Sequence, residues 1–416
     1  MKALVISVGG SPEGQAKTIL ELKPQTVVFF ASQASVENVS LIKGMCPGLS
    51  FGDRKALVDD ETDLPGCYQK AREALRLAID KAGSVGEVAF DFTGGTKVMS
   101  AALVLAGGEV GAKPFYVGGT RRNKDGLGVV VSGSETLTKQ ANPWDAFAVP
   151  EQRRAALLFN HGRIEAARET MAGVCARSRS PGLQEWAKIA VDVMEFYVHW
   201  DAFRHGEAVS ALRTSKAQER LRVFSAAVGG NRLDELREGI GRGVQYVQEL
   251  VGVSRGGKFL TPLHVRDVLA NAKRRASEGR WDDAVARLYR ALEMAAQVQL
   301  ASKHGLNSEK IDEARVPKER RQAVEERLGP PPWSDLGLWK SFALLNELRD
   351  ELGARFFAAE EDISKILDVR NHSILAHGVR AVDAEVFKRF LDTVMRVAQI
   401  PEAELPTFPE WPEEVN

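Results

Sequence analysis

The seven residues from Asp91 to Lys97, Asp-Phe-Thr-Gly-Gly-Thr-Lys, are of types that together can bind an anion. Strand formers occupy 87–90 before them, and a small, apolar run at 98–106 after them predicts a buried helix. A strand, a glycine turn and the start of a helix therefore follow one another. Free N–H groups at a helix start attract a phosphate, glycines let it approach the backbone closely, and Lys97 adds positive charge.

The stretch resembles the Asp-x-Thr-Gly-Gly-Thr-Lys signature of CARF domains, which are Rossmann-like sensors in CRISPR-associated proteins. The resemblance implies that this part of the chain binds a cyclic oligoadenylate. The spacing differs from the Walker pattern of Gly, four residues, Gly-Lys-Ser/Thr, so an ordinary P-loop is disfavoured. The plainer alternative is a tight turn between strand and helix, with a capping threonine and a solvated lysine.

Arg370 and His377 form the second candidate site. In a continuous helix their seven-residue step is nearly two turns, which would place both on one face about 10 Å apart, flanking one phosphate. Imidazole can act as general base or acid near neutral pH, and an arginine can stabilise charge on a phosphoryl group. The plainer alternative is that Arg370 pairs with Asp368 or Glu361, while His377 caps a helix before Gly378.

This spacing resembles the motif of HEPN ribonucleases, an arginine and a histidine with four to six residues between them, and with the polar Asn371 after the arginine. The run 287–293 is also similar to an early helix of the CARF–HEPN group. The resemblance implies metal-free cleavage of single-stranded RNA, in which the ribose 2′-OH attacks and leaves a 2′,3′-cyclic phosphate and a 5′-OH. His372 is the rival histidine; in the family it would occupy a variable position, so it ranks below His377.

The first third of the chain alternates between strand and helix signals, which predicts a doubly wound sheet. Strands are expected at 3–8, 26–31, 113–117 and 128–131 as well as before Asp91, with helices at 15–22, 66–82 and 98–106. Ligands of such sheets bind outside the carboxyl ends of the strands. Three strand ends carry suitable groups, which gives a candidate ligand set of Gly9, Gly10, Ser11, Ser32, Thr93, Gly94, Gly95, Thr96 and Lys97.

A dinucleotide site is the other possibility for such a sheet. Ser11 stands where the second glycine of the dinucleotide fingerprint should be, and Pro12 removes an N–H group, so this possibility is disfavoured. A basic loop at 118–124 is either a solvated hairpin turn or an extra source of charge for a polyanionic ligand.

After residue 144 the strand signals stop. Helices are expected at 153–175, 184–205, 215–228 and 233–251, then, beyond a glycine-rich break at 252–257, at 262–278, from 280, and at 317–328, 338–352, 361–369 and 384–398. We therefore expect a CARF-like Rossmann sensor domain at 1–145, an all-α helical linker at 146–260 and an all-α HEPN-like nuclease domain at 261–416. The linker carries no chemistry that we recognise, because His161, His199 and His205 lack metal-ligand spacing.

Charge and cysteine content narrow the kinds of binding partner, metal site and cell compartment that fit this chain. Lysine and arginine number 56 and aspartate and glutamate 56, so the formal net charge of +0 argues against a surface coated in basic charge for nucleic acid. Three cysteines suggest neither a disulfide framework nor a zinc site and fit a reducing cytoplasm. Neither a signal peptide nor a membrane span is expected.

Together the resemblances imply a ribonuclease of type III CRISPR antiviral defence, activated by cyclic tetra- or hexa-adenylate and needing no other cofactor and no metal. HEPN sites of this group are composite and CARF domains bind across a two-fold axis, so a homodimer is implied. Two alternatives stay open. The chain could be a CARF regulator whose helical part binds DNA or a partner, or the first domain could itself cleave the cyclic activator.

Overall fold

The computed structural model of the 416-residue chain describes the following residues: 1–119, 121, 130–131, 133–142, 147–178, 180–255 (254 and 255 by their backbone alone), 260–373, 378–379, 381–413 and 415. The chain forms two compact units, one made of 1–150 with 176–184 and the other of 151–175 with 185–416. Each unit is described by itself. None of the helices in these ranges is long and apolar enough to cross a lipid bilayer.

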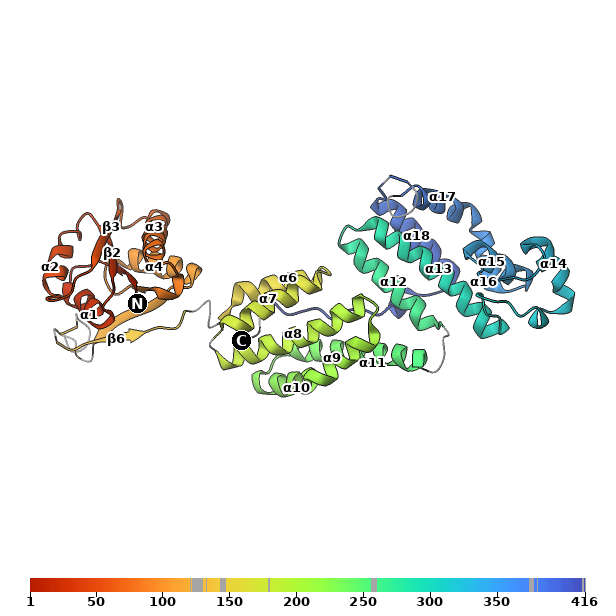
Figure 1. Ribbon diagram of the computed structural model, residues 1–416, viewed down its shortest axis with the longest axis horizontal. Coiled ribbons are helices and arrows are strands. Elements are labelled where there is room, and N and C mark those ends of the chain that lie inside the picture. Colours follow the sequence, from red (N-terminus) through yellow and green to blue (C-terminus); the bar gives the residue numbers. More distant parts are fainter. Residues whose placement is uncertain are drawn as a thin grey trace. The chain divides into compact units, whose positions relative to one another are not determined.

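The first unit is built on a sheet of six strands in the order β3-β2-β1-β4-β5-β6. Strands β2, β3 and β6 of this sheet are labelled in Figure 1. Its strands are β1 (Ala3–Ser7), β2 (Thr26–Ser32), β3 (Gly52–Val58), β4 (Val88–Asp91), β5 (Lys113–Gly119) and β6 (Glu135–Lys139). All neighbours pair in parallel except β6, which is antiparallel to β5. The chain order reverses between β1 and β4, so the loops that follow these two strands meet at the switch point where such sheets bind ligands.

Helices cover both faces of this sheet: α1 (Pro12–Leu22) and α2 (Asn38–Gly44) on one, α3 (Leu64–Ala82) and α4 (Lys97–Val110) on the other. Leu4 and Ile6 of β1 face the first pair, and Ala3 and Val5 face the second. Because both faces are buried, the central strands are apolar at nearly every position. This doubly wound sheet is the fold expected from the sequence.

Three elements of the first unit differ from the expectation. Strand β3 was not expected because it lies at the sheet edge and carries Asp53, Arg54 and Lys55, which hide a strand pattern. Helix α2 was missed as well. The last strand is β6 rather than 128–131; residues 128 and 129 lie outside the described ranges, and Val130 forms only an isolated bridge.

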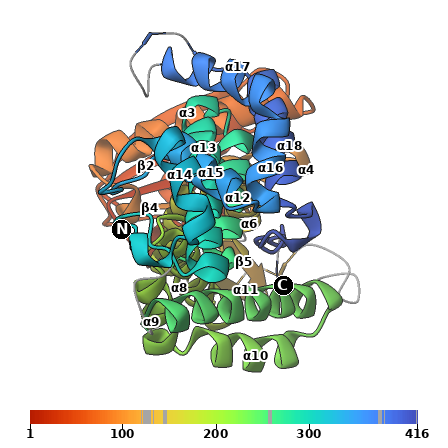
Figure 2. The same ribbon diagram turned by 90° about the vertical axis from the view of Figure 1, so that its right-hand side faces the viewer.

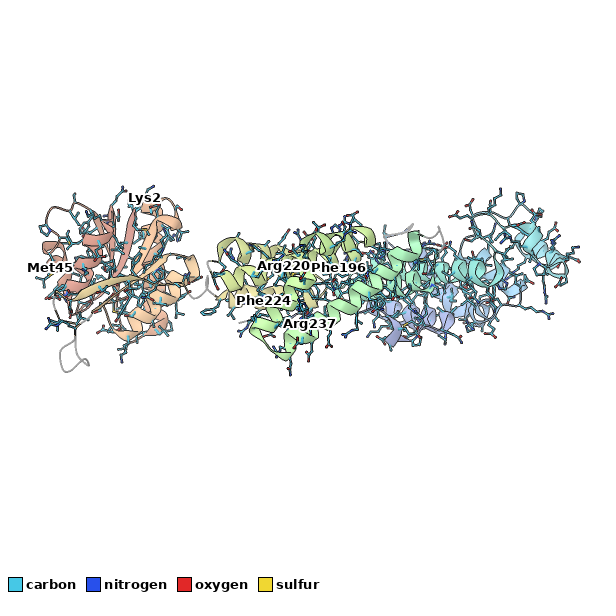
Figure 3. All side chains as sticks on the ribbon, turned by 90° about the horizontal axis from the view of Figure 1, so that it is seen from below. Lys2, Met45, Phe196, Arg220, Phe224 and Arg237 are labelled. Carbon is cyan, nitrogen blue, oxygen red and sulfur yellow. The ribbon has the colours of Figure 1, made fainter. Side chains whose placement is uncertain are left out.

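The second unit is helical. The first group of helices comprises α6 (Val149–Asn160), α7 (Ile164–Arg177), α8 (Pro181–Asp201), α9 (His205–Ser215), α10 (Ala217–Val228) and α11 (Asn231–Arg255). Figure 3 shows Phe196, Phe224 and Arg220 of this group, in which Arg220 pairs with Glu185 and Asp192 at 2.8 Å each. The single helix expected at 153–175 is two helices, because Gly162 turns the chain with a φ of +79°. The expected glycine break starts late, since α11 continues to Arg255.

The second group comprises α12 (Pro262–Ser277), α13 (Trp281–His304), α14 (Lys318–Leu328), α15 (Leu338–Glu347), α16 (Glu351–Ala358), α17 (Glu360–Asn371) and α18 (Ala384–Ala398). Helices α12 and α13 lie side by side as a hairpin (Figures 1 and 2), and α13 supplies Leu288 and Leu292 to the core. The helix expected at 338–352 is interrupted, because buried Asp350 caps α16 by accepting a hydrogen bond from Leu352 N–H at 2.9 Å.

Two carboxylates, the buried Asp267 and the partly buried Asp201, hold the two helical groups together. Asp201, at the end of α8, accepts hydrogen bonds from Asn271 Nδ2 at 2.9 Å and Arg274 Nε at 2.8 Å, both on α12. Asp267, also on α12, accepts from Trp200 Nε1 and pairs with His205 Nε2, each at 2.8 Å. Each carboxylate is therefore satisfied across the joint, which fixes α12 against the first group.

The segment after α18 returns across the first helical group. Trp411 is buried, and its backbone N–H donates to Asn160 Oδ1 at 2.7 Å while its carbonyl accepts from Asn160 Nδ2 at 3.1 Å. The ring of Phe408 packs against Tyr197 and Trp200, with centroids 4.6 and 4.9 Å apart. Residues at both ends of the second unit thus share one aromatic core.

Candidate functional site

The loops that follow β1 and β4 pack backbone against backbone at the switch point. A Cβ placed on Gly9 would lie 2.6 Å from Gly95 N. One on Gly94 would lie 2.9 Å from Gly9 N and still closer to Ser7 O. Real Cβ atoms essentially never come within 3.0 Å of such neighbours. Glycine at 9 and 94 is therefore what lets the two loops meet.

A cavity of about 430 Å³ opens at these loops. Six of the nine predicted ligand residues line it: Gly9, Gly10, Ser11, Thr93, Gly94 and Gly95. Tyr116 and the carboxylates of Glu13 and Glu135 also line it, which the sequence reasoning did not anticipate. Ser11 is the N-cap residue of α1 but makes no side-chain cap, and Pro12 has no N–H group, so the first-turn N–H groups left for a ligand belong to Glu13 and Gly14, which line the cavity.

The remaining three predicted ligand residues do not line this cavity. Ser32 is buried and hydrogen-bonds with Ser35, whose Oγ lies 3.2 Å from its own. Thr96 Oγ1 caps α4 by accepting from Met99 N–H at 3.2 Å, and it donates to the Glu61 carbonyl at 3.0 Å. Lys97 is exposed at the first position of α4. The hydroxyls of Ser32 and Thr96 therefore have structural partners.

The side chain of Asp91 stabilises the glycine turn through hydrogen bonds. Its wholly buried carboxylate accepts hydrogen bonds from Thr93 N–H at 2.8 Å, from the Thr93 hydroxyl, and from Thr18 Oγ1 at 2.5 Å. Thr93 Oγ1 in turn accepts from Val117 N–H at 2.7 Å, so this side chain ties the turn to β5. Burial, partly offset by these hydrogen bonds, raises the pKa of Asp91. In the sequence, only the position of Asp91 at the end of a buried strand could have indicated that it stabilises the turn.

A larger cavity of about 540 Å³ lies in the second unit, beneath the segment 402–410. Its two cations are occupied: Lys273 pairs with Glu402, and Arg274 binds Asp201 and lies over the ring of Phe408 at 4.1 Å. This cavity belongs to the packing of the returning segment, so the cavity at the glycine loops remains the candidate ligand site.

Arg370 and Asn371 lie at the end of α17. Arg370 Nη1 donates to Asn371 Oδ1 at 3.0 Å, and the guanidinium lies over the Tyr289 ring, 4.7 Å from its centroid. The predicted alternative partners lie elsewhere: Glu361 binds Lys365 at 2.5 Å, and Asp368 Oδ1 lies 3.4 Å from His372 Nδ1. Within the described ranges no carboxylate lies within 4.0 Å of Arg370. Its positive charge is therefore not neutralised by a neighbouring acid.

The helix does not continue toward His377, so the expectation of two nearly aligned turns is wrong. Helix α17 ends at Asn371, and His372 follows as its C-cap residue, with Nδ1 2.8 Å from the carbonyl of Asp368. Gly378 N–H donates to the Ser373 carbonyl at 3.1 Å, which brings the chain back to the end of α17. His377 itself lies outside the described ranges, as does most of the basic loop 118–124.

The three histidines of the first helical group have structural partners. His161 Nδ1 lies 2.9 Å from the Leu157 carbonyl, His199 lies between Glu195 and Glu207, and His205 pairs with Asp267. Among the residues that the structure describes, no three His, Cys, Asp or Glu side chains are grouped as metal ligands.

Comparisons with known proteins agree with this arrangement. Residues 147–239 match the Csm6 6H domain and residues 255–401 match the Csm6 HEPN domain. The chain belongs to the Csm6 family. It is 28% identical over 397 residues to the CRISPR system endoribonuclease Csm6 of Thermus thermophilus, covering 90% of this chain and 80% of that protein.

The fold also matches a solved Csm6. The match to the structure of Enterococcus italicus Csm6 bound to cyclic hexa-2′-fluoro-hexa-dAMP covers 97% of this chain and 96% of the Enterococcus chain, with a TM-score of 0.62 and 12% identity. Together with the two family matches, this fold confirms the order of an α/β domain, a 6H domain and a HEPN domain. The family matches and the Thermus thermophilus relative confirm the expected assignment to the CARF–HEPN ribonucleases. The region expected as a mere helical linker is the 6H domain.

Proposed function

We propose that this chain is an endoribonuclease of type III CRISPR antiviral defence that acts in the cytoplasm. Its N-terminal domain binds cyclic tetra- or hexa-adenylate as an activator, and its HEPN domain then cleaves single-stranded RNA without a metal ion. The observation that carries this proposal is the guanidinium of Arg370 at the end of α17, which has no carboxylate within 4.0 Å among the described residues and lies within the part that matches the Csm6 HEPN domain.

The activator site is proposed at the cavity between the two glycine loops. Backbone N–H groups at the start of α1 and beside Gly94 and Gly95 can bind phosphates, which glycine lets approach closely. Lys97 adds charge at the start of α4 from outside the cavity wall, where it can meet a ligand that extends beyond it. A cavity of about 430 Å³ has room for only part of a cyclic oligoadenylate, so we propose that the rest of the ligand contacts a second subunit.

The nuclease site is proposed around Arg370, Asn371 and His377. The RNA supplies the nucleophile, its ribose 2′-OH, and His377 acts as general base or acid. Arg370 stabilises charge on the phosphoryl group as the fifth bond forms, and Asn371 orients the guanidinium through the bond to Nη1. The products are then a 2′,3′-cyclic phosphate and a 5′-OH.

We further propose a homodimer, in which each subunit supplies one Arg–His set to a composite nuclease site. Its isologous two-fold interface would also let two N-terminal domains share one cyclic activator.

The test is RNA cleavage by the full chain with cyclic tetra-adenylate and cyclic hexa-adenylate added separately, and with neither. One ring size should stimulate cleavage, with EDTA present throughout, and the new ends should be a cyclic phosphate and a 5′-OH. A cleavage rate that neither cyclic oligoadenylate changes would contradict the proposed activation. Cleavage that stops in EDTA would contradict the metal-free chemistry.

A further inference from the structure

We propose that Tyr289 is a positioning residue for Arg370: its ring face holds the guanidinium in place for the phosphate while leaving the charge and most N–H donors free. This inference rests on the proposed nuclease site. The juxtaposition that carries it is the guanidinium of Arg370, on α17, lying 4.7 Å from the centroid of the Tyr289 ring, on α13.

An arginine in this place needs a restraint. Arg370 is the second-last residue of α17, and a long side chain at a helix end loses conformational entropy when one geometry is imposed on it. A carboxylate would impose that geometry, but it would also neutralise the charge and use two donors of the planar fork. A ring face attracts the cation through its π electrons and uses no N–H donor in the guanidinium plane.

The surroundings of Arg370 fit a restraint of this kind. One donor, on Nη1, goes to Asn371, an uncharged acceptor. Glu293, one turn beyond Tyr289 on α13, forms its ion pair with Arg290 at 2.5 Å and forms none with Arg370. The cation therefore meets a ring and an amide, and it keeps its charge for the substrate.

The ring is itself well anchored. Tyr289 is half-buried on the long helix α13, between core residues Leu288 and Leu292, and packs against the main hydrophobic cluster of the HEPN domain. Burial raises the pKa of its phenol, so the ring is neutral at physiological pH. The described residues offer the phenol hydroxyl no hydrogen-bond partner, which implies that the ring face rather than the hydroxyl does the positioning.

The experiment compares Tyr289→Leu and Tyr289→Phe with wild type by single-turnover cleavage of a labelled single-stranded RNA, with saturating cyclic oligoadenylate. Leucine should slow cleavage by about 2- to 30-fold, the range that corresponds to the strength of a cation–π contact. Phenylalanine, which keeps the ring, should restore the rate to within about twofold of wild type. Binding of an uncleavable 2′-deoxy substrate should change little.

A matched control is available in the same domain, where Arg327 lies over the Phe357 ring at 5.4 Å. Phe357→Leu removes the same kind of contact away from Arg370 and should leave the cleavage rate unchanged. Thermal unfolding of every variant separates loss of the fold from loss of positioning, and Tyr289→Met serves as a second ring-free variant if leucine does not fold.

A second comparison asks whether Tyr289 acts through Arg370. In an Arg370→Ala background, Tyr289→Leu should have no further effect on the residual rate, because there is no guanidinium left to position. The inference is overturned if folded Tyr289→Leu cleaves like wild type, if Tyr289→Phe is as slow as leucine, or if the slowing persists without Arg370. It is also overturned if leucine speeds cleavage, since the ring would then be sequestering the arginine. If Arg370→Ala and His377→Ala themselves cleave normally, the proposed nuclease site has failed, whatever Tyr289 does.

Discussion

Gly94→Ala should weaken activator binding more than any other single methyl group added to the cavity wall. A Cβ at this position would lie 2.9 Å from Gly9 N and closer still to Ser7 O and Gln15 Nε2. The side chain of Gln15 can turn away, but the other two atoms belong to the backbone of β1 and its loop. The two loops must therefore separate, which alters the array of N–H groups that faces the cavity.

The size of the effect follows from those contacts. Forcing an extra methyl group into a packed site typically costs about 1–3 kcal/mol, and backbone neighbours place Gly94 toward the upper end. Displacing one hydrogen bond to a charged phosphate costs about 1.5–3 kcal/mol, which is roughly 10- to 150-fold in affinity. We therefore expect Gly94→Ala to bind the cyclic oligoadenylate at least about tenfold more weakly and to unfold at a lower temperature.

Gly10→Ala is the matched control, because a Cβ there meets nothing within 4 Å although Gly10 lines the same cavity. Isothermal titration of each variant with cyclic tetra- and hexa-adenylate, together with thermal unfolding, gives both quantities. If Gly94→Ala matches Gly10→Ala in affinity and in unfolding temperature, the close packing of the two loops does not form the ligand site.

Three further predictions concern charged side chains. Lys97→Ala should weaken activator binding without changing the unfolding temperature, and the loss should shrink as salt is raised, because Lys97 is exposed. Since burial raises the pKa of Asp91 above the usual 3.8, the N-terminal domain should lose stability as pH rises from about 4 through the raised value. In Asp91→Asn, the free energy of unfolding measured by chemical denaturation should no longer fall with pH over this range. Burial alone would raise the pKa of Asp350, but hydrogen bonds, including those from Lys303 and His304, hold it at about 2. Asp350 should therefore contribute about 2 kcal/mol to the free energy of unfolding above pH 3.8, and this contribution should be lost as pH falls toward 2. Chemical denaturation of the HEPN domain at a series of pH values measures it. Asp350→Asn should lack this acid-dependent loss.

Local patterns in the sequence were enough to predict the parts of the fold whose signals are short-range. The glycine turn at 94–95 and the last helix, α18, are found where they were expected. Strand β3 was missed because a sheet edge tolerates charge. The helix ends at Asp201 and Asn371 were missed because tertiary contacts and backbone caps set them rather than composition.

The site residues, too, could be predicted only where a local pattern in the sequence determines their role. Residues that act through their backbone, such as Gly9 and Gly94, follow from the pattern because only glycine fits there. The hydroxyls of Thr93 and Ser32 looked equally suitable, but both bind partners that only the folded chain brings near. The contact between Tyr289 and Arg370 joins residues far apart in sequence on different helices, and no local spacing could have indicated it.

The identity of the acid–base histidine decides the central claim. The measurement is single-turnover cleavage of a short RNA, with saturating activator and EDTA, by wild type, Arg370→Ala, His377→Ala and His372→Ala. Loss of either proposed group should slow cleavage by about 10²–10⁴-fold, and the double variant Arg370→Ala/His377→Ala should be little worse than either single one. His372→Ala should remain active, because its Nδ1 lies against the Asp368 carbonyl at the end of α17. An active His377→Ala beside an inactive His372→Ala would contradict the proposed site.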